Sequence, residues 1–191
     1  MVSTAVTEVP APFARALGAL RDAARTLRIQ VQEVPAPRAA RYSVALEGTL
    51  ADPGDDAHEL ADGTFVVLFD PPTSEDAEGT FRVVVLVRAE LDAEMSVDPM
   101  LSEVAWTWLT ESLARFAGPL DSLGGSVTRT ITTSHGAVSA RPGLVELELR
   151  ASWTPQTADL GGHLEAWAHV MRSCAGLPDV PEGVAVLPAR A

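Results

Sequence analysis

Acidic side chains gather in two stretches of the sequence and could bind a hard cation. If the strands between them run up and down, both stretches emerge at the same end of a sheet and form an acidic pole. Carboxylate oxygens are the ligands that calcium and magnesium prefer. The spacing matches no ordered cation-binding loop, so we interpret residues 52–62 as a solvated surface loop and assign no metal ligand. The stretches are 52–62, with Asp52, Asp55, Asp56, His58, Glu59 and Asp62, and 90–98, with Glu90, Asp92, Glu94 and Asp98.

A nucleophilic cysteine is the second chemical possibility. Cys174 falls on the apolar face of the last expected helix, eleven residues after His163 and five after His169. On a helix only residues three or four apart lie side by side, so neither histidine is placed beside the thiol. We therefore expect a buried structural cysteine. We assign no catalytic residue, no cofactor-binding residue and no cofactor.

Two tryptophans, Trp106 and Trp108, lie in the second expected helix. Trp108 projects into the middle of the apolar stripe, which predicts a core position. Trp106 lies about 100° away from the centre of that stripe. A half-exposed tryptophan is a common interface anchor, so Trp106 is a candidate interaction residue. The alternative is simple packing at the rim of the core.

Helices and strands that would position these residues follow from apolar spacing. The 3.6-residue period predicts helices over 12–27, 98–116 and 159–174. Alternation or continuous apolar runs predict strands over 42–50, 63–69, 81–91, 126–134 and 144–153, with 29–34 as a weaker candidate.

The last two predicted strands should pair as an antiparallel hairpin. Its second strand turns apolar residues to the helices and Glu146 and Glu148 away from them, because a one-residue slip would bury both glutamates. Short connections between the elements favour antiparallel pairing throughout. The sequence thus predicts an α+β fold, an antiparallel sheet of five to six strands with helices on one face. We expect one domain over 12–178 with tails at 1–11 and 179–191. The residues expected to face the helices are Val145, Leu147, Leu149 and Trp153.

The net charge argues against two classes of partner. Fourteen basic and 26 acidic residues give a formal charge of −12, and every basic residue is arginine. Such a chain repels phosphate backbones and anionic membrane surfaces, so we expect no nucleic-acid binding and no membrane binding. We find no secretory signal pattern at the N-terminus and no apolar run long enough to span a membrane, which favours a cytoplasmic location.

Several segments resemble an actinobacterial family catalogued as "domain of unknown function 3000". The likeness covers roughly 12–178, and the family name implies no activity, cofactor or site. The element order is also similar to that of the type III secretion chaperone-like fold, whose members are non-catalytic dimers that hold partner segments. The segments are Pro-Phe-Ala-Arg-Ala-Leu at 12–17, Gly-Thr-Phe-Arg at 79–82, Val-Arg-Ala-Glu-Leu at 87–91, Gly-Gly-Ser-Val-Thr-Arg-Thr at 124–130, Arg-Ala-Ser-Trp-Thr-Pro at 150–155 and His-Leu-Glu-Ala-Trp at 163–167.

Two functions remain open from the sequence. The first is a non-catalytic protein-interaction module, adaptor or chaperone-like, that binds a protein partner and forms a homodimer. The homodimer is expected because Val66, Leu68, Val84 and Leu86 would be exposed on a lone protomer. The alternative is an enzyme or small-ligand-binding protein that uses the acidic pole, with a divalent cation as a possible cofactor. A pocket of converging ionisable groups would favour the enzyme, and an open sheet edge would favour the module.

Overall fold

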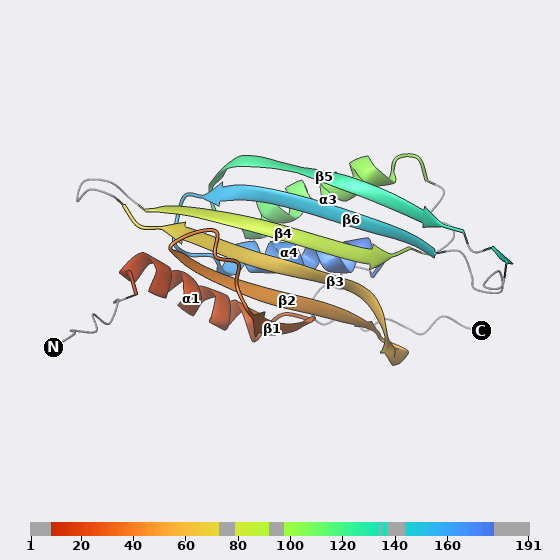
Figure 1. Cartoon of the computed structure of the whole chain (residues 1–191), viewed down its shortest axis with the longest axis horizontal. Helices are drawn as coiled ribbons and strands as arrows, with labels where there is room; N and C mark the ends of the chain where they lie inside the picture. Colours follow the sequence, from red (N-terminus) through yellow and green to blue (C-terminus); the bar gives the residue numbers. More distant parts are fainter. Residues whose placement is uncertain (1–8, 73–78, 92–97, 134, 137–143, 178–191) are drawn as a thin grey trace.

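A computed structural model describes residues 9–72, 79–91, 98–133, 135–136 and 144–177. The described chain forms one antiparallel six-stranded sheet in the order β1-β2-β3-β4-β6-β5 (Figure 1). This confirms the predicted α+β fold. The elements are α1 (Ala11–Ala24), β1 (Gln30–Val34), β2 (Tyr42–Asp52), β3 (Asp55–Asp70), β4 (Thr80–Glu90), α3 (Leu101–Phe116), β5 (Leu120–Thr132), β6 (Leu144–Pro155) and α4 (Gly161–Cys174).

The sheet owes its two faces to strict alternation in the central strands. In β4 the odd-numbered residues are buried and the even-numbered ones reach solvent, and Phe65, Val67 and Phe69 of β3 are fully buried opposite them. Since successive side chains of a strand point to opposite faces, one face becomes wholly apolar. The helices cover that face: α3 and α4 lie behind the sheet in Figure 1, and α1 packs against α4.

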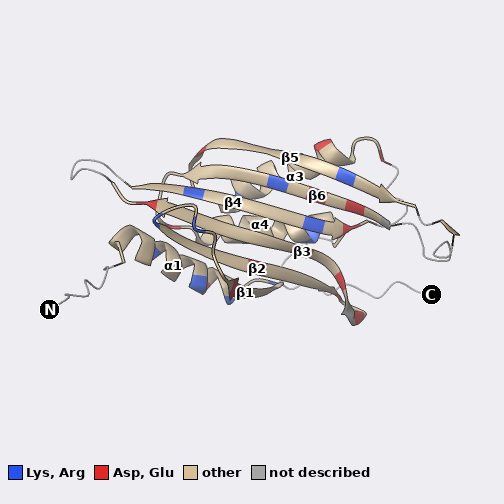
Figure 2. Ribbon diagram, viewed as in Figure 1, with Lys and Arg blue, Asp and Glu red and all other residues tan. Residues whose placement is uncertain are grey.

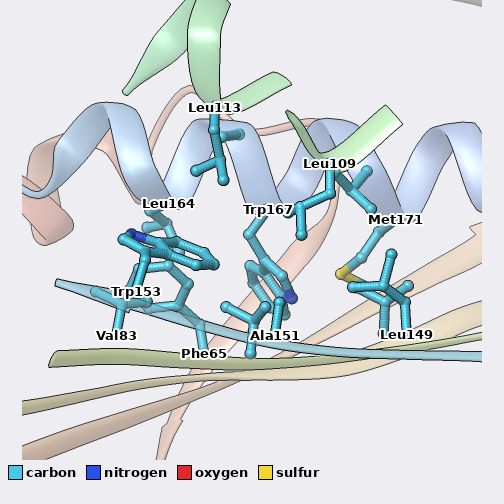
Figure 3. Close-up of a cluster of buried hydrophobic side chains, with 14 of the residues drawn as sticks. Phe65, Val83, Leu109, Leu113, Leu149, Ala151, Trp153, Leu164, Trp167 and Met171 are labelled. Atoms are coloured by element: carbon cyan, nitrogen blue, oxygen red, sulfur yellow. The ribbon is translucent and has the colours of Figure 1, made fainter. Parts of the chain in front are cut away.

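Two aromatic side chains fill the space between the sheet and the helices. Trp153 of β6 and Trp167 of α4 are both 0% exposed and lie among leucines of α3 and α4 (Figure 3). Trp167 lies over a pair of glycines that face each other, Gly48 of β2 and Gly63 of β3. A side-chain atom at Gly48 would collide with the indole ring, and one at Gly63 would collide with the Leu86 carbonyl and lie 3.1 Å from the ring. The missing glycine side chains therefore make the room that the large ring needs.

The structure contains the predicted C-terminal hairpin and also the weaker strand candidate at 29–34. β5 and β6 pair antiparallel, with Leu147, Leu149 and Trp153 buried and Val145 half-buried against the core. Glu146 is exposed. The weak candidate strand at 29–34 is β1, which pairs with β2. β5 starts six residues earlier than the predicted 126, and a register shift between Asp121 and Gly124 marks the early part.

The predicted acidic loop over 52–62 is wrong. β2 and β3 form one long hairpin in which Asp52 faces Asp55, so only two residues, Pro53 and Gly54, make the turn. The remaining residues of the stretch are part of β3 and follow the sheet. The tip of this hairpin and the end of β4 do lie at the same end of the sheet (Figure 1). Residues 92–97 of the second acidic stretch lie outside the described residues, as do 1–8 and 178–191 of the expected tails.

The core position predicted for Trp108 is also wrong. Trp106 and Trp108 are both half-buried and pack against the edge of the core. The buried stripe of α3 passes through Ala105, Leu109 and Leu113 instead. The apolar stripe of the sequence is wide enough to allow both rotations. Leu101, Ala105, Leu109 and Leu113 form one row of the helix, and Val104, Trp108 and Phe116 lie on the adjacent row, which Ser112 interrupts.

Candidate protein-interaction site

The described part of the chain holds one pair of side chains that resembles a nucleophile and its base. Ser112 Oγ of α3 lies 2.8 Å from His169 Nδ1 of α4. Ser112 is only 2% exposed, and its hydroxyl donates to the carbonyl of Trp108, 2.6 Å away, one turn earlier. A serine that hydrogen-bonds the preceding turn of its own helix and lies between two helices has no room for a substrate. The pair joins α3 to α4.

His163, the other candidate histidine, is buried beside Trp153. The indole Nε1 of Trp153 donates to His163 Nδ1 across 3.1 Å, and the two rings stack. Burial lowers the pKa of His163 to about 4, and the charge of Asp159 acts in the opposite direction without outweighing it. The ring is therefore neutral near pH 7 and has no contact with solvent through which to act as an acid or base.

Cys174 is 1% exposed in the core, as predicted. Burial raises the pKa of its thiol to about 12, so the reactive thiolate is essentially absent near neutral pH. We expect the native protein to react with a thiol-specific disulfide reagent at least about a hundredfold more slowly than the urea-unfolded chain. Release of the reagent chromophore measures both rates. Equal rates in the two states would contradict the buried position.

Charged residues on the sheet face away from the helices form a row across three strands (Figure 2). Arg88 of β4 lies 3.7 Å from Asp62 of β3 and 3.1 Å from Glu148 of β6, which also binds Arg150 at 2.8 Å. The hydrogen bond from Arg150 lowers the pKa of Glu148, whereas partial burial raises that of Asp62. The row consists of ion pairs between half-buried carboxylates and exposed arginines that remain accessible to solvent, and such pairs contribute little to stability individually.

The acidic pole does not form a cation site within the described residues. No group of three or more histidine, cysteine, aspartate or glutamate side chains that could hold a metal occurs there. The carboxylate of Asp52 instead accepts a hydrogen bond from the backbone of Gly54 in the turn, and Asp62 turns to Arg88. Asp52 thus stabilises the turn of the hairpin, and Asp62 forms an ion pair on the sheet surface.

A groove of about 1500 Å³ lies between α1, the start of α4 and the adjoining ends of β3 and β4. Phe69, Phe81 and Phe116 contribute apolar surface, and Arg15 and Glu165 contribute charge. Its wall reaches Pro72 and Gly79, on either side of residues 73–78, which are outside the described chain. We assign no site to this groove.

The free edge of β5 is the longest unpartnered feature of the described sheet. β5 has 13 residues and pairs only with β6. Residues 124–132 are all exposed except the half-buried Val127, and Ile131 is 64% exposed. They contain no proline and a single charged side chain, Arg129. Such an edge presents backbone N–H and C=O groups to any extended chain that approaches.

Trp106 lies beside this edge. A side-chain atom built on Gly125 of β5 would come within 2.9 Å of the Trp106 ring, so the indole covers the glycine on the helix side of the sheet. Arg129, four residues further along β5 and on the same face, donates from Nη1 to the carbonyl of Asp98 just before α3 across 2.9 Å. The half-buried tryptophan predicted as an interaction residue therefore borders an open strand. The sequence missed the edge itself, because strand order is not visible in spacing.

The opposite edge of the sheet is different. β1 has only five residues and is followed by Pro35 and Pro37. Short edge strands next to prolines resist pairing with another chain, because proline lacks the N–H that a ladder needs. Within the described residues, the sheet therefore has one short edge flanked by prolines, at β1, and one open edge, at β5.

The fold and this edge define a class: an α+β protein with an open antiparallel sheet, helices on one face and one unguarded edge strand. The chain matches the family model described as "Protein of unknown function (DUF3000)" over residues 9–185, and it belongs to this family. No curated protein and no solved structure matches it. None of the described helices is long and apolar enough to cross a membrane.

Proposed function

We propose that this chain is a non-catalytic protein-interaction module that binds an extended segment of a protein at the free edge of β5. The observation that carries the proposal is the edge itself, an exposed strand of 13 residues with one partner. Main-chain hydrogen bonds to such an edge supply affinity, and the side chains along it supply specificity.

Trp106 supports this surface. Its ring lies against Gly125, next to the edge, and remains half-exposed. Tryptophans in such positions bury a large apolar area when a partner arrives and often dominate binding energy. An incoming strand would pass directly beside the indole, so the strand ladder and the aromatic anchor would act on one partner.

The proposal includes the finer expectations drawn from the sequence. It takes the module to be a chaperone-like protein of an actinobacterial cytoplasm. A sequence with 14 arginines and neither lysine nor asparagine supports a GC-rich genome of that kind. The proposal assigns no cofactor, metal or nucleic acid to the module, since its net charge of −12 opposes phosphate binding.

Site-specific photo-cross-linking in the native host tests the proposal. A photoreactive residue at Thr130, exposed on β5, should give an adduct heavier than the 20.1 kDa chain. The same residue at Thr80, exposed on β4 but away from the edge, should give little or none. Mass spectrometry of the adduct identifies the captured protein. Equal yields at the two positions, or no adduct at Thr130, would overturn the proposed surface.

A further inference from the structure

We infer that the strand added to β5 is β5 of a second copy of this chain, so that two sheets join edge to edge around a two-fold axis. This inference rests on the proposed function, because it names the partner of the same edge. It extends the six-stranded sheet of one chain into a continuous sheet shared by two. Four observations carry it: the number of open edges, the symmetry of the strand, the fit of one isoleucine and the charge at the axis.

A two-fold pairing through β5 produces a closed assembly. The described sheet has one open edge, β5, whereas β1 is short and followed by prolines. When each copy uses its β5, both outer edges of the joined sheet are β1 strands that resist further addition. An interface that uses the same patch on both copies closes at two, so the edge is consumed without forming fibres.

The regular part of β5 is symmetric about Thr128. Pairing with β6 is continuous over residues 124–132, whose central residue is Thr128. With Thr128 opposite its own copy, all nine positions find a partner and Ser126 faces Thr130. Arg129 then faces Val127 and not a second Arg129, which avoids the repulsion of like charges directly opposite each other.

The same register gives the most exposed apolar side chain a place to pack. Ile131, 64% exposed, falls opposite Gly125 of the second copy. Both residues lie on the helix side of the sheet, since Ile131 pairs with Val145 and Gly125 with Ala151. The Trp106 ring covers Gly125 there. Ile131 of each copy would therefore lie against Trp106 of the other copy. The two-fold axis makes this contact occur twice.

The charges near the axis do not oppose the contact. Asp62, Arg88, Glu148 and Thr128 stand side by side on neighbouring strands. The row of ion pairs thus ends in a neutral threonine at the edge. Thr128, Thr130 and Ser126 carry no charge, although the whole chain carries −12. Short polar β-branched residues pair well across strands.

Light scattering on the purified full-length chain tests the inference. We expect a mass near twice 20.1 kDa at micromolar concentration. Thr128→Glu puts two carboxylates opposite each other at the axis and should raise the dissociation constant at least about tenfold. An equimolar mixture of Thr128→Glu and Thr128→Lys should restore the dimer beyond either variant alone. Thr80→Glu, on β4, is the matched control and should leave the mass unchanged.

A second pair of variants tests the packing of Ile131. Trp106 and Trp108 are both half-buried in α3, but only Trp106 lies at Gly125. Trp106→Ala should weaken the dimer about tenfold or more, as loss of an anchor residue does, whereas Trp108→Ala should leave the dissociation constant within about threefold. Circular dichroism spectra confirm that each variant is folded.

The outcomes separate this inference from the proposed function. If the mass stays near 20 kDa at protein concentrations up to about 100 µM, the chain is a monomer well above the micromolar range in which we expect the dimer. That result would overturn the second copy as the partner of β5. If Thr130 then cross-links to a different protein, the edge is still the binding surface and only the identity of the partner was wrong. A dimer that survives in Thr128→Glu at its original strength overturns the edge as its interface.

Discussion

Replacing Trp167 with alanine should lower the free energy of unfolding by about 4 kcal/mol, the range measured for removing a large aromatic side chain from a packed core. The ring is 0% exposed, packs on Phe65 with centroids 5.7 Å apart, and donates from Nε1 to the carbonyl of Leu86 across 3.1 Å. Its loss leaves a cavity and removes the hydrogen bond that the indole donates to the Leu86 carbonyl. Urea unfolding followed by circular dichroism, at one fixed protein concentration, gives the value.

Gly48 supplies the control for this prediction. A side-chain atom at Gly48 would collide with the Trp167 ring, 2.5 Å away, and meets nothing else closer than the Ile29 side chain at 3.2 Å. Gly48→Ala should therefore destabilise the wild-type chain, yet cost much less when Trp167 is already alanine. Coupled residues in contact show interaction energies of about 0.5–3 kcal/mol. If the two substitutions act additively, the ring does not occupy the site described.

Acidification should remove about 3 kcal/mol of stability through His163 alone. Its pKa is about 4 in the folded protein, against 6.5 for an ordinary histidine, because burial disfavours the charged ring. The unfolded chain therefore takes up a proton first as the pH falls. The stability present above pH 6.5 is lost between pH 6.5 and about 4, by at most the 3 kcal/mol that the pKa difference implies.

The hydrogen bonds of His163 also favour the neutral ring and therefore a lowered pKa. Trp153 Nε1 can only donate, so His163 Nδ1 must accept and the single proton of the neutral ring lies on Nε2. Nε2 is buried without a hydrogen-bond partner among the described residues. A second proton would have to occupy Nδ1 and displace the bond from Trp153, so the charged ring gains no new partner.

His163→Gln tests this without removing the acceptor, because its amide oxygen can take the Trp153 bond. Free energies of unfolding from urea titrations at pH 7.5, 6, 5 and 4 should fall more gently in this variant than in the wild type. His58→Gln, at an exposed position of β3, is the matched control and should follow the wild type. Parallel curves for His163→Gln and the wild type would show that another group causes the acid sensitivity.

Strands with one buried face were predictable from the sequence, because burial imposes a period of two. β4 and β6 show it clearly: Val83, Val85 and Val87 are buried, as are Leu147 and Leu149. The sequence also predicts the inward position of Trp153, which is 0% exposed. These positions follow from local pattern alone, since the alternative register would bury charged residues.

Features that depend on contacts between distant residues were not predictable. The sequence predicts a loop at the start of β3 because apolar and polar residues do not alternate there. In the structure the β2–β3 hairpin extends past the end of β4, so this part of the strand has no buried face that would impose alternation. Gly124 and Gly125 lie before the predicted start of this strand at 126, yet both pair with β6, and a side chain at Gly125 would collide with the Arg150 carbonyl and the Trp106 ring. Trp106 was identified as a candidate, but its neighbour, an open edge, followed only from the strand order.

The place of β4 in the sheet also matters while the chain is being made. Each β3–β4 pair joins residues of one continuous meander, whereas β4 and β6 pair Val83 with Trp153 and Glu90 with Glu146, across α3 and β5. A ribosome that has completed β4 must add more than fifty further residues before the first of these β6 partners exists. During that interval β4, one of the two central strands of the mature sheet, has no partner on the side that β6 later occupies. The chain thus begins with a more apolar edge, at β4, which its own C-terminal half must cover.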